Sequence, residues 1–104
     1  MDFLRKLLGM GPSVDLADLA KKGAQLVDVR TKAEYASGHI KGSLNIPLDQ
    51  LSQRLNQLKK DKPIITYCAS GIRSGSARRL LRSQGFTEVY NGGGWMDLQR
   101  KLGL

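Results

Sequence analysis

The segment that decides the fold is PIITYCASGIRSGSARRLL, residues 63–81. It opens with an apolar run at 63–67, whose composition is typical of a strand covered on both faces of a sheet. A helical pattern follows at 74–85, with Ser74 as a candidate N-cap. Between these elements lie Cys68, the only cysteine of the chain, and a short loop of small residues. The order predicts a strand that delivers Cys68 to the beginning of a helix.

Strands and helices alternate along the rest of the chain as well. Short apolar runs predict strands at 25–29, 43–47, 63–67 and 88–90. Helical spacing and caps predict helices at 15–22, 31–38, 48–58, 74–85 and 95–102. Thr31 and Glu34 have capping-box spacing, whereas the glycine-rich residues 91–94 predict a loop. This alternation predicts an α/β fold with a mostly parallel central sheet of about five strands and helices on both faces.

The length of the chain, 104 residues, suits one domain. We expect this domain at 13–104, preceded by a short helix or extension at 1–12. Apolar residues recur there at helical spacing: Phe3, Leu4, Leu7 and Leu8. Packing of this helix on the domain is the favoured interpretation. Binding to a membrane surface or to a partner is the alternative.

The charge and composition narrow the class of protein. Lys and Arg number 17 against 9 Asp and Glu, a net charge of +8 that attracts anions. Only 6% of the residues are aromatic, with no basic–aromatic stripe, so we expect no nucleic-acid partner. No apolar run is long enough to span a bilayer, and residues 1–12 lack the order of a secretory signal, so a cytoplasmic location is expected. Small size and few aromatic residues favour a monomer.

The loop after Cys68 has the composition of an anion site. Its small residues, with Gly71 relaxing the backbone, allow N–H groups to turn inward at a helix N-terminus. Those dipoles and the nearby Arg73 favour the thiolate, so we expect a lowered pKa for Cys68 and a reactive sulfur. The alternative is a small hydrophobic residue buried in the core, the usual position of a lone cysteine. With one cysteine and one histidine, His39, neither an internal disulfide nor a structural zinc site is expected.

Three motifs together resemble those of rhodanese-type sulfurtransferases. CASGIRS, at 68–74, resembles the active-site loop of that family. LVDVRTKAEYASGHIKGSLNIPL, at 26–48, resembles its other signature: Asp-x-Arg, then Glu, then Gly-His-Ile, then Gly-x-x-Asn-Ile-Pro. EVYNGGGW, at 88–95, resembles its strand ending in paired glycines, although the commoner pattern has a tryptophan a few residues later than Trp95. The resemblance spans roughly residues 14–98 and is specific because separate motifs occur in the right order.

This resemblance implies a rhodanese fold and a covalent reaction at Cys68. The thiolate takes a sulfane sulfur from thiosulfate or a persulfide donor and passes it to a thiophilic acceptor, such as a thiol or a sulfur-relay protein. No metal or organic cofactor is expected. The residues expected to bind the substrate are Ala69, Ser70, Gly71, Ile72, Arg73, Ser74 and Arg30. The residues expected to support the site are Asp28, Glu34 and His39.

Most of these residues have a simpler interpretation as well. Arg73 is a surface cation in one reading and an anion ligand in the favoured one. Arg30 either adds positive charge at the mouth of the site or forms a salt bridge with Glu34. Asp28, in a buried strand, is expected to bond backbone groups or an arginine. His39 is expected to bond across a turn rather than to act as a base.

Two other functions compete with sulfur transfer. Related cell-cycle phosphatases place five residues between cysteine and arginine, whereas four separate Cys68 from Arg73 here. The shorter ring suits one sulfur atom better than a phosphoryl group, which argues against a phosphatase or an arsenate reductase. A non-enzymatic or partner-dedicated sulfur carrier, which docks an acidic partner on its basic surface, is the other alternative.

Overall fold

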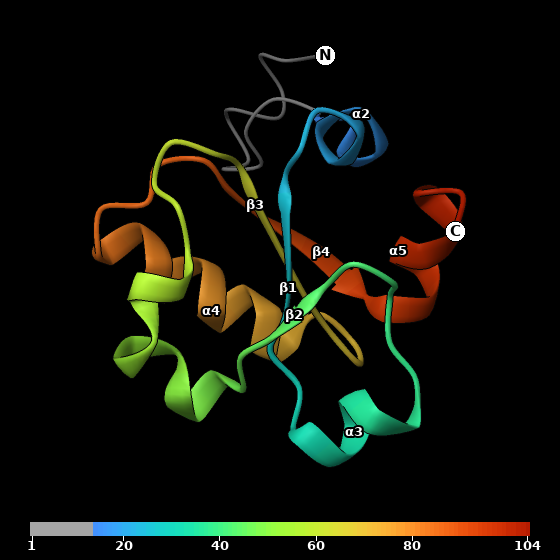
Figure 1. The fold of residues 1–104 in the computed structure, drawn as a ribbon, viewed down its shortest axis with the longest axis horizontal. Coiled ribbons are helices and arrows are strands. Elements are labelled where there is room, and N and C mark those ends of the chain that lie inside the picture. Colours follow the sequence, from blue (N-terminus) through green and yellow to red (C-terminus); the bar gives the residue numbers. More distant parts are fainter. Residues whose placement is uncertain (1–13) are drawn as a thin grey trace.

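Four parallel strands form the centre of the structure, a computed structural model that describes residues 14–104. Their spatial order is β2-β1-β3-β4 (Figure 1). Their bounds are β1 Gln25–Asp28, β2 Leu44–Asn45, β3 Ile64–Cys68 and β4 Val89–Gly94. The parallel α/β architecture is therefore confirmed, with four strands in the described part of the chain instead of about five. The helix or extension expected at 1–12 lies outside the described residues.

Helices cover both faces of the sheet, and this explains why all five residues of β3 are buried. Their bounds are α2 Leu16–Lys21, α3 Lys32–Ser37, α4 Ile72–Ser83 and α5 Trp95–Lys101. Residues of β3 alternate between two clusters, with Ile64 and Cys68 on the α4 side and Ile65 and Tyr67 on the α5 side. Figure 1 shows α4 on one side of the strands and α2 and α5 on the other.

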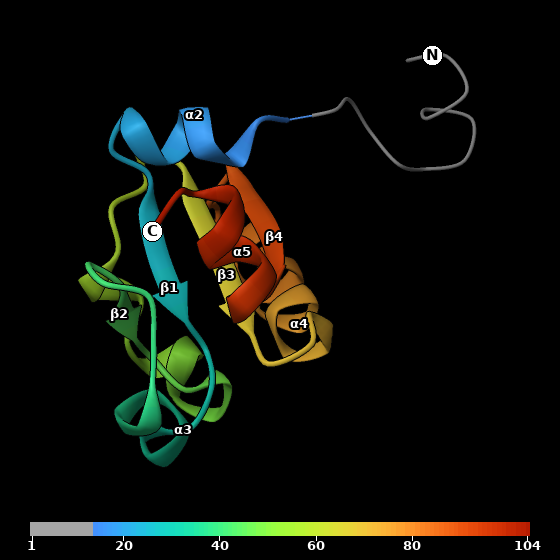
Figure 2. The same cartoon turned by 90° about the vertical axis from the view of Figure 1, so that its right-hand side faces the viewer.

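The carboxyl ends of β1 and β3 lie at the same end of the sheet. Figure 2 shows α3, which follows β1, and the loop between β3 and α4 at this end. The predicted capping box of α3 is confirmed, because Thr31 Oγ1 accepts from the Glu34 N–H and Glu34 accepts from the Thr31 N–H. The local caps thus bring α3 and the Cys68 loop to one edge, where ligands bind in open α/β sheets.

The structure corrects the helix predicted at 48–58. Two 3₁₀ segments, η1 Leu48–Gln53 and η2 Leu55–Gln57, occupy this range and are separated at Arg54. Leu51 and Leu58 are still buried in the core. The leucine spacing therefore marked the buried side correctly, but the i→i+3 bonds of a 3₁₀ helix replace those of an α-helix.

The prediction of a loop at the glycine-rich residues 91–94 is also wrong, since these residues belong to β4. Asn91 pairs with Thr66 and Gly94 pairs with Cys68, across an irregularity in the register. A Cβ at Gly92 would lie 2.9 Å from side-chain atoms of both Ile65 and Leu98, so the absence of a side chain allows this strand to pack closely. β4 thereby reaches the Cys68 loop.

Candidate active site

Cys68 ends β3 and lies beneath a loop that points backbone N–H groups at its sulfur. The Gly71 N–H donates to Sγ at 3.0 Å and the Ser74 N–H at 3.4 Å. The hydroxyl oxygen of Ser74 also lies 3.4 Å from Sγ. Cys68 has 0% exposure, whereas Ala69 and Ser70 above it are exposed. The sulfur is therefore enclosed by the helix N-terminus.

The groups around Sγ determine the pKa of the Cys68 thiol. Burial raises the pKa of Cys68, but the hydrogen bonds of the sulfur with Ser74 and with the backbone N–H groups of Ser70 and Gly71 lower it by more, so that the net pKa lies below the ordinary value. The residue is thus more than a small hydrophobic side chain of the core. Fixed backbone dipoles that favour its anion point at the sulfur, as the prediction of a nucleophile requires.

Gly71 makes this loop possible. It is the N-cap of α4 and has a φ of 101°, in the left-handed region that side chains rarely adopt. A Cβ there would also lie 3.2 Å from the Cα of Gly93 in β4. The helix therefore begins at Ile72, and the prediction of Ser74 as N-cap is wrong. Ser74 instead lies in the first turn, fully buried, where its hydroxyl faces the sulfur.

Asn91 in β4 connects Ser74 to the loop, and sequence reasoning missed it. Its Oδ1 accepts from Ser74 Oγ at 2.6 Å and from the Gly93 N–H at 2.9 Å. Its Nδ2 donates to the carbonyl of Gly71 at 3.0 Å. An asparagine followed by glycine is typical of a turn, so no local signal pointed to this contact.

Arg73 leaves the loop toward α3 and forms a two-pronged ion pair with Glu34. Its Nη1 and Nη2 lie 2.7 and 3.0 Å from the two carboxylate oxygens of Glu34. The hydrogen bond with Arg73 is the main cause that lowers the pKa of Glu34 to about 2. A guanidinium has five N–H donors, so a pair that uses two of them leaves donors for an anion. Glu34 therefore both caps α3 and orients Arg73.

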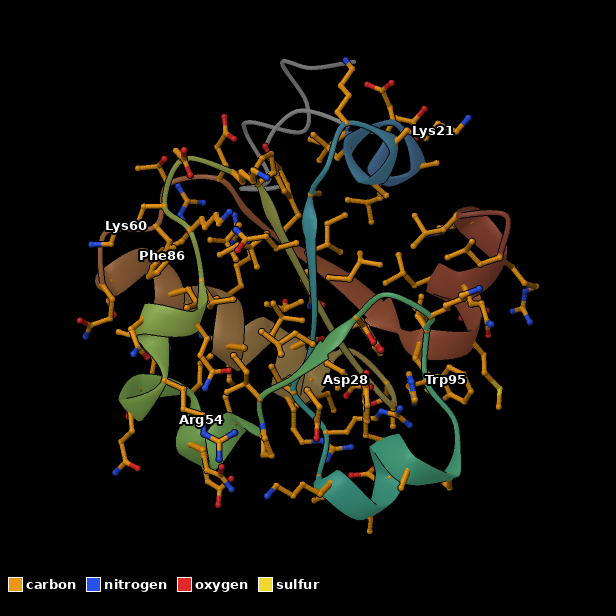
Figure 3. All side chains as sticks on the ribbon, in the orientation of Figure 1. Lys21, Asp28, Arg54, Lys60, Phe86 and Trp95 are labelled. Atoms are coloured by element: carbon orange, nitrogen blue, oxygen red, sulfur yellow. The ribbon has the colours of Figure 1, made fainter. Side chains whose placement is uncertain are left out.

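Arg30 is buried and does not lie at the mouth of the site. It donates from Nε and Nη2 to the carboxylate of Asp28 and from Nη2 to the Gly38 carbonyl at 2.6 Å. Its side chain is 4% exposed, and its guanidinium carbon lies 4.9 Å from the ring centre of Trp95. The alternative of a salt bridge between Arg30 and Glu34 is wrong, because Asp28 is the partner. Figure 3 shows Asp28 and Trp95 on the carboxyl-end side of the sheet.

Asp28 and His39 have the contacts expected of supporting residues. Besides its pair with Arg30, Asp28 accepts from the Arg30 backbone N–H at 2.9 Å. Nδ1 of His39 lies 2.7 Å from the Tyr35 carbonyl, and the two rings stack with centroids 3.7 Å apart. Within residues 14–104 no hydrogen bond joins His39 to the Cys68 loop. The expected bond across the turn is therefore present.

A hollow of about 320 Å³ lies beside Arg73. Its floor is mainly apolar, and the residues that line it are Val29, Thr31, Pro47, Leu48, Asp49 and Arg73. The described part of the chain contains no group of three or more His, Cys, Asp or Glu side chains that could hold a metal ion. It also contains no helix long and apolar enough to cross a membrane.

Comparison with known proteins agrees with this geometry. The chain is 36% identical over 74 residues to thiosulfate sulfurtransferase PspE of Escherichia coli (strain K12), covering 69% of this chain and 71% of PspE. It is 53% identical over 68 residues to the uncharacterized protein YqhL of Bacillus subtilis (strain 168), covering 65% of this chain but only 54% of YqhL. The solved structure of the human single-domain sulfurtransferase TSTD1 matches with a TM-score of 0.69 and 32% identity, covering 88% of this chain and 97% of that one. Since the model of the rhodanese-like domain also matches residues 14–101, the chain belongs to the rhodanese-like family.

Proposed function

We propose that this protein is a sulfurtransferase that carries a sulfane sulfur as a persulfide on Cys68. The observation that carries the proposal is the enclosure of Sγ by the N–H groups of Gly71 and Ser74 at the start of α4. These donors stabilise a thiolate, and they are equally suited to the negative charge of a persulfide formed at the same place. The thiosulfate sulfurtransferases among the relatives support the same chemistry.

Loading is a displacement at the outer sulfur of an anionic donor such as thiosulfate. The Cys68 thiolate attacks that sulfur, a new S–S bond forms, and the bond to the sulfite group breaks. Sulfite leaves with the electron pair, and Cys68 keeps an anionic persulfide. The net charge of +8 attracts the donor, and Arg73 is the cation of the loop placed to bind its oxyanion end.

Discharge breaks the same S–S bond, with Cys68 as the leaving group. A thiol acceptor, as its thiolate, attacks the outer sulfur of the persulfide and the S–S bond to Cys68 breaks. The electron pair returns to Cys68 Sγ, where the same N–H groups receive the charge. Because the two half-reactions share one residue, ping-pong kinetics follow. Neither step requires a proton from His39 or a metal ion.

The surface around the Cys68 loop favours a protein as the sulfur acceptor. The sulfurtransferase would then serve a dedicated protein partner. Ile72 in the loop is 78% exposed, and Met96, near the start of α5, is 60% exposed. Helix α4 carries four arginines and no acidic residue, with Arg79 and Arg82 exposed. An acidic protein that presents a cysteine thiol beside an apolar patch fits this surface. Cytoplasmic location and a monomeric state stay predictions.

Mass spectrometry of the intact protein tests the proposed function. After incubation with thiosulfate and removal of excess reagent, we expect one added sulfur atom, removed again by a thiol or by cyanide. Cys68→Ser is the matched control and should gain no sulfur. A folded protein with a free thiol that gains no sulfur from either thiosulfate or a low-molecular-weight persulfide overturns the proposal.

A further inference from the structure

The hydroxyl group of Ser74 has one proton and two neighbours that can take it. Asn91 Oδ1 lies at 2.6 Å and Cys68 Sγ at 3.4 Å. A serine hydroxyl donates one hydrogen bond and accepts others through its lone pairs. Which neighbour receives the proton therefore decides whether Ser74 meets the sulfur as a donor or as an acceptor.

The orientation of the Asn91 amide determines which neighbour receives the hydroxyl proton of Ser74. The Gly71 carbonyl can only accept, so the group 3.0 Å from it must be the Asn91 NH₂. The Gly93 N–H can only donate, so the group 2.9 Å from it must be the Asn91 carbonyl oxygen. A flipped amide would oppose acceptor to acceptor and donor to donor at these two positions. Oδ1 therefore faces Ser74, and because Oδ1 cannot donate, the hydroxyl must donate to it.

We propose that Asn91 is a positioning residue that holds the Ser74 hydroxyl proton away from Cys68 Sγ, so that the serine offers the sulfur only a lone pair. The neutral thiol suits this arrangement, because S–H can donate to Ser74 Oγ, which donates onward to Asn91. A thiolate does not suit it, because the negative charge on Sγ faces a lone pair of Ser74 Oγ until the Ser74 hydroxyl rotates. A loaded Cys68 suits it as well, because the charge then lies on the outer sulfur. The statement about the loaded Cys68 rests on the proposed function, whereas those about the thiol and the thiolate do not.

In this arrangement the backbone N–H groups, and not the Ser74 hydroxyl, lower the pKa of the thiol. A hydroxyl lowers it only when its proton faces the sulfur, so the stabilisation of the thiolate comes from the N–H groups of Gly71, Ser70 and Ser74. Asn91 keeps the thiol less acidic than this loop would otherwise make it. A less acidic thiol gives a smaller fraction of thiolate but a more nucleophilic one.

The charged groups around Cys68 stay constant in Asn91→Ala, Ser74→Ala and their double variant, whereas Asn91→Asp adds a carboxylate. They are Arg73 on α4, Glu34 on α3, and the Asp28–Arg30 pair after β1, while residues 91–94 of β4 carry no charge. Substitution of Asn91 by alanine therefore frees the Ser74 hydroxyl and removes the contacts with Gly71 and Gly93, without changing the local charge. Asn91 is exposed, so its substitution leaves the core intact.

The experiment is the thiol pKa of Cys68 in the full chain, measured from the pH dependence of its alkylation by iodoacetamide. The proteins are the wild type, Asn91→Ala, Ser74→Ala and the double variant. We expect Asn91→Ala to lower the pKa by about one unit, because the freed hydroxyl turns to the thiolate. Ser74→Ala should not raise the pKa, because the hydroxyl that is removed offered the sulfur only a lone pair. In the Ser74→Ala background, Asn91→Ala should no longer lower it.

Asn91→Asp separates this role from simple support of the loop. The carboxylate still accepts from Ser74 and Gly93 but cannot donate to Gly71, so the pKa should rise while that of Asn91→Ala falls. If loss of the Gly71 contact were the whole effect, the pKa would rise in Asn91→Ala as well as in Asn91→Asp, where the new carboxylate also raises it. A rise of about one unit in Ser74→Ala alone, or an equal shift for Asn91→Ala in both backgrounds, overturns the proposal. These pKa measurements do not require sulfur transfer. The inference about Asn91 therefore fails or succeeds independently of the proposed function.

Discussion

Glu34 and Arg73 join helix α3 to the start of α4, beside Cys68, through two N···O contacts of 2.7 and 3.0 Å, although the residues are 39 positions apart in the sequence. The carboxylate also caps α3 through the Thr31 N–H. The Glu34 side chain therefore both caps α3 and orients Arg73, the expected anion ligand, although the sequence analysis treated the two residues separately. The two tasks can be separated experimentally.

Arg73→Lys should weaken the binding of the sulfur donor without abolishing sulfur transfer. A lysine keeps the charge but cannot form the two-pronged pair with Glu34, so its position beside the loop is lost. We expect the KM for thiosulfate to rise by about tenfold, with a smaller change in kcat. The matched control is Arg79→Lys, on the exposed side of the same helix, which should leave both constants unchanged. Equal effects of the two substitutions would contradict the assignment of Arg73.

Glu34→Gln should retain the cap of α3 while losing the charge opposite Arg73. Glutamine is an accepted partner in a capping box, so the free energy of unfolding should fall by less than in Glu34→Ala, where loss of the cap costs about 1 kcal/mol. Urea unfolding of the three proteins measures the difference, with Glu88→Gln as an exposed control. Equal losses in Glu34→Gln and Glu34→Ala would show that the ion pair, and not the cap, carries the stability.

Acid should weaken the protein through Glu34 in a defined pH window. Since the pKa of Glu34 is about 2 in the folded state, below its ordinary value of 4.5, the unfolded state binds the proton first. The contribution of Glu34 is therefore complete above about pH 4.5 and is lost as the pH falls toward 2. The side chain is 35% exposed, so solvent reduces the effect. The urea midpoint of the wild type should fall more steeply in this window than that of Glu34→Gln, and parallel curves would contradict the pairing.

Removal of Asp28 should be the most destabilising single change near the site. Asp28→Ala leaves the buried guanidinium of Arg30 without its ion pair, at a cost of about 3–5 kcal/mol. That is a large part of the stability of a small domain, which is about 5–15 kcal/mol. Thermal unfolding should show a much lower Tm than for Asp61→Ala, an exposed control. A double variant, Asp28→Leu with Arg30→Met, should recover part of the loss, and a further loss would contradict the pairing.

Gly71→Ala should damage both the loop and the thiolate. The left-handed φ of 101° costs a residue with a side chain about 1–2 kcal/mol, and the new Cβ would press on Gly93. Displacement of the Gly71 N–H should raise the thiol pKa and slow sulfur loading by at least about tenfold. Gly23→Ala is a matched control, because Gly23 has a φ of 96° and open space around it. It should lose similar stability with no change in loading, whereas an equal loss of loading would indicate a general effect of unfolding.

A phenyl phosphate ester should be a poor substrate compared with thiosulfate. The ring of four residues between Cys68 and Arg73 is one shorter than that of the related phosphatases, and Sγ is enclosed at 3.0 Å by Gly71. Release of phenolate, followed at the same enzyme concentration as sulfur transfer, should be slower by orders of magnitude. Faster hydrolysis of the ester than sulfur transfer would favour the phosphatase alternative.

Much of this molecule follows from short-range information in the sequence. The apolar run before Cys68, the capping box at Thr31 and Glu34 and the glycine at 71 act within a few residues of each other. They predicted a parallel α/β fold, the delivery of Cys68 to a helix N-terminus and a thiol of lowered pKa. The leucine spacing at 48–58 predicted the buried side but not the 3₁₀ form, because both helical types repeat apolar residues at similar intervals.

The partners of the polar side chains were decided only by the tertiary structure. The sequence left Arg30 between the mouth of the site and a salt bridge with Glu34. It did not assign Asp28 to Arg30 or Glu34 to Arg73, because hydrogen-bond geometry depends on how β1, α3 and α4 are placed in space. It also read Ser74 as a cap and Asn91 as part of a loop. Pairing of β4 with β3 across an irregular register brings Asn91 to Ser74, a contact between β4 and α4 with no local signature. The sequence by itself thus determined that Cys68 follows a buried strand and precedes a helix, whereas the packing of distant segments decided which side chains surround its sulfur.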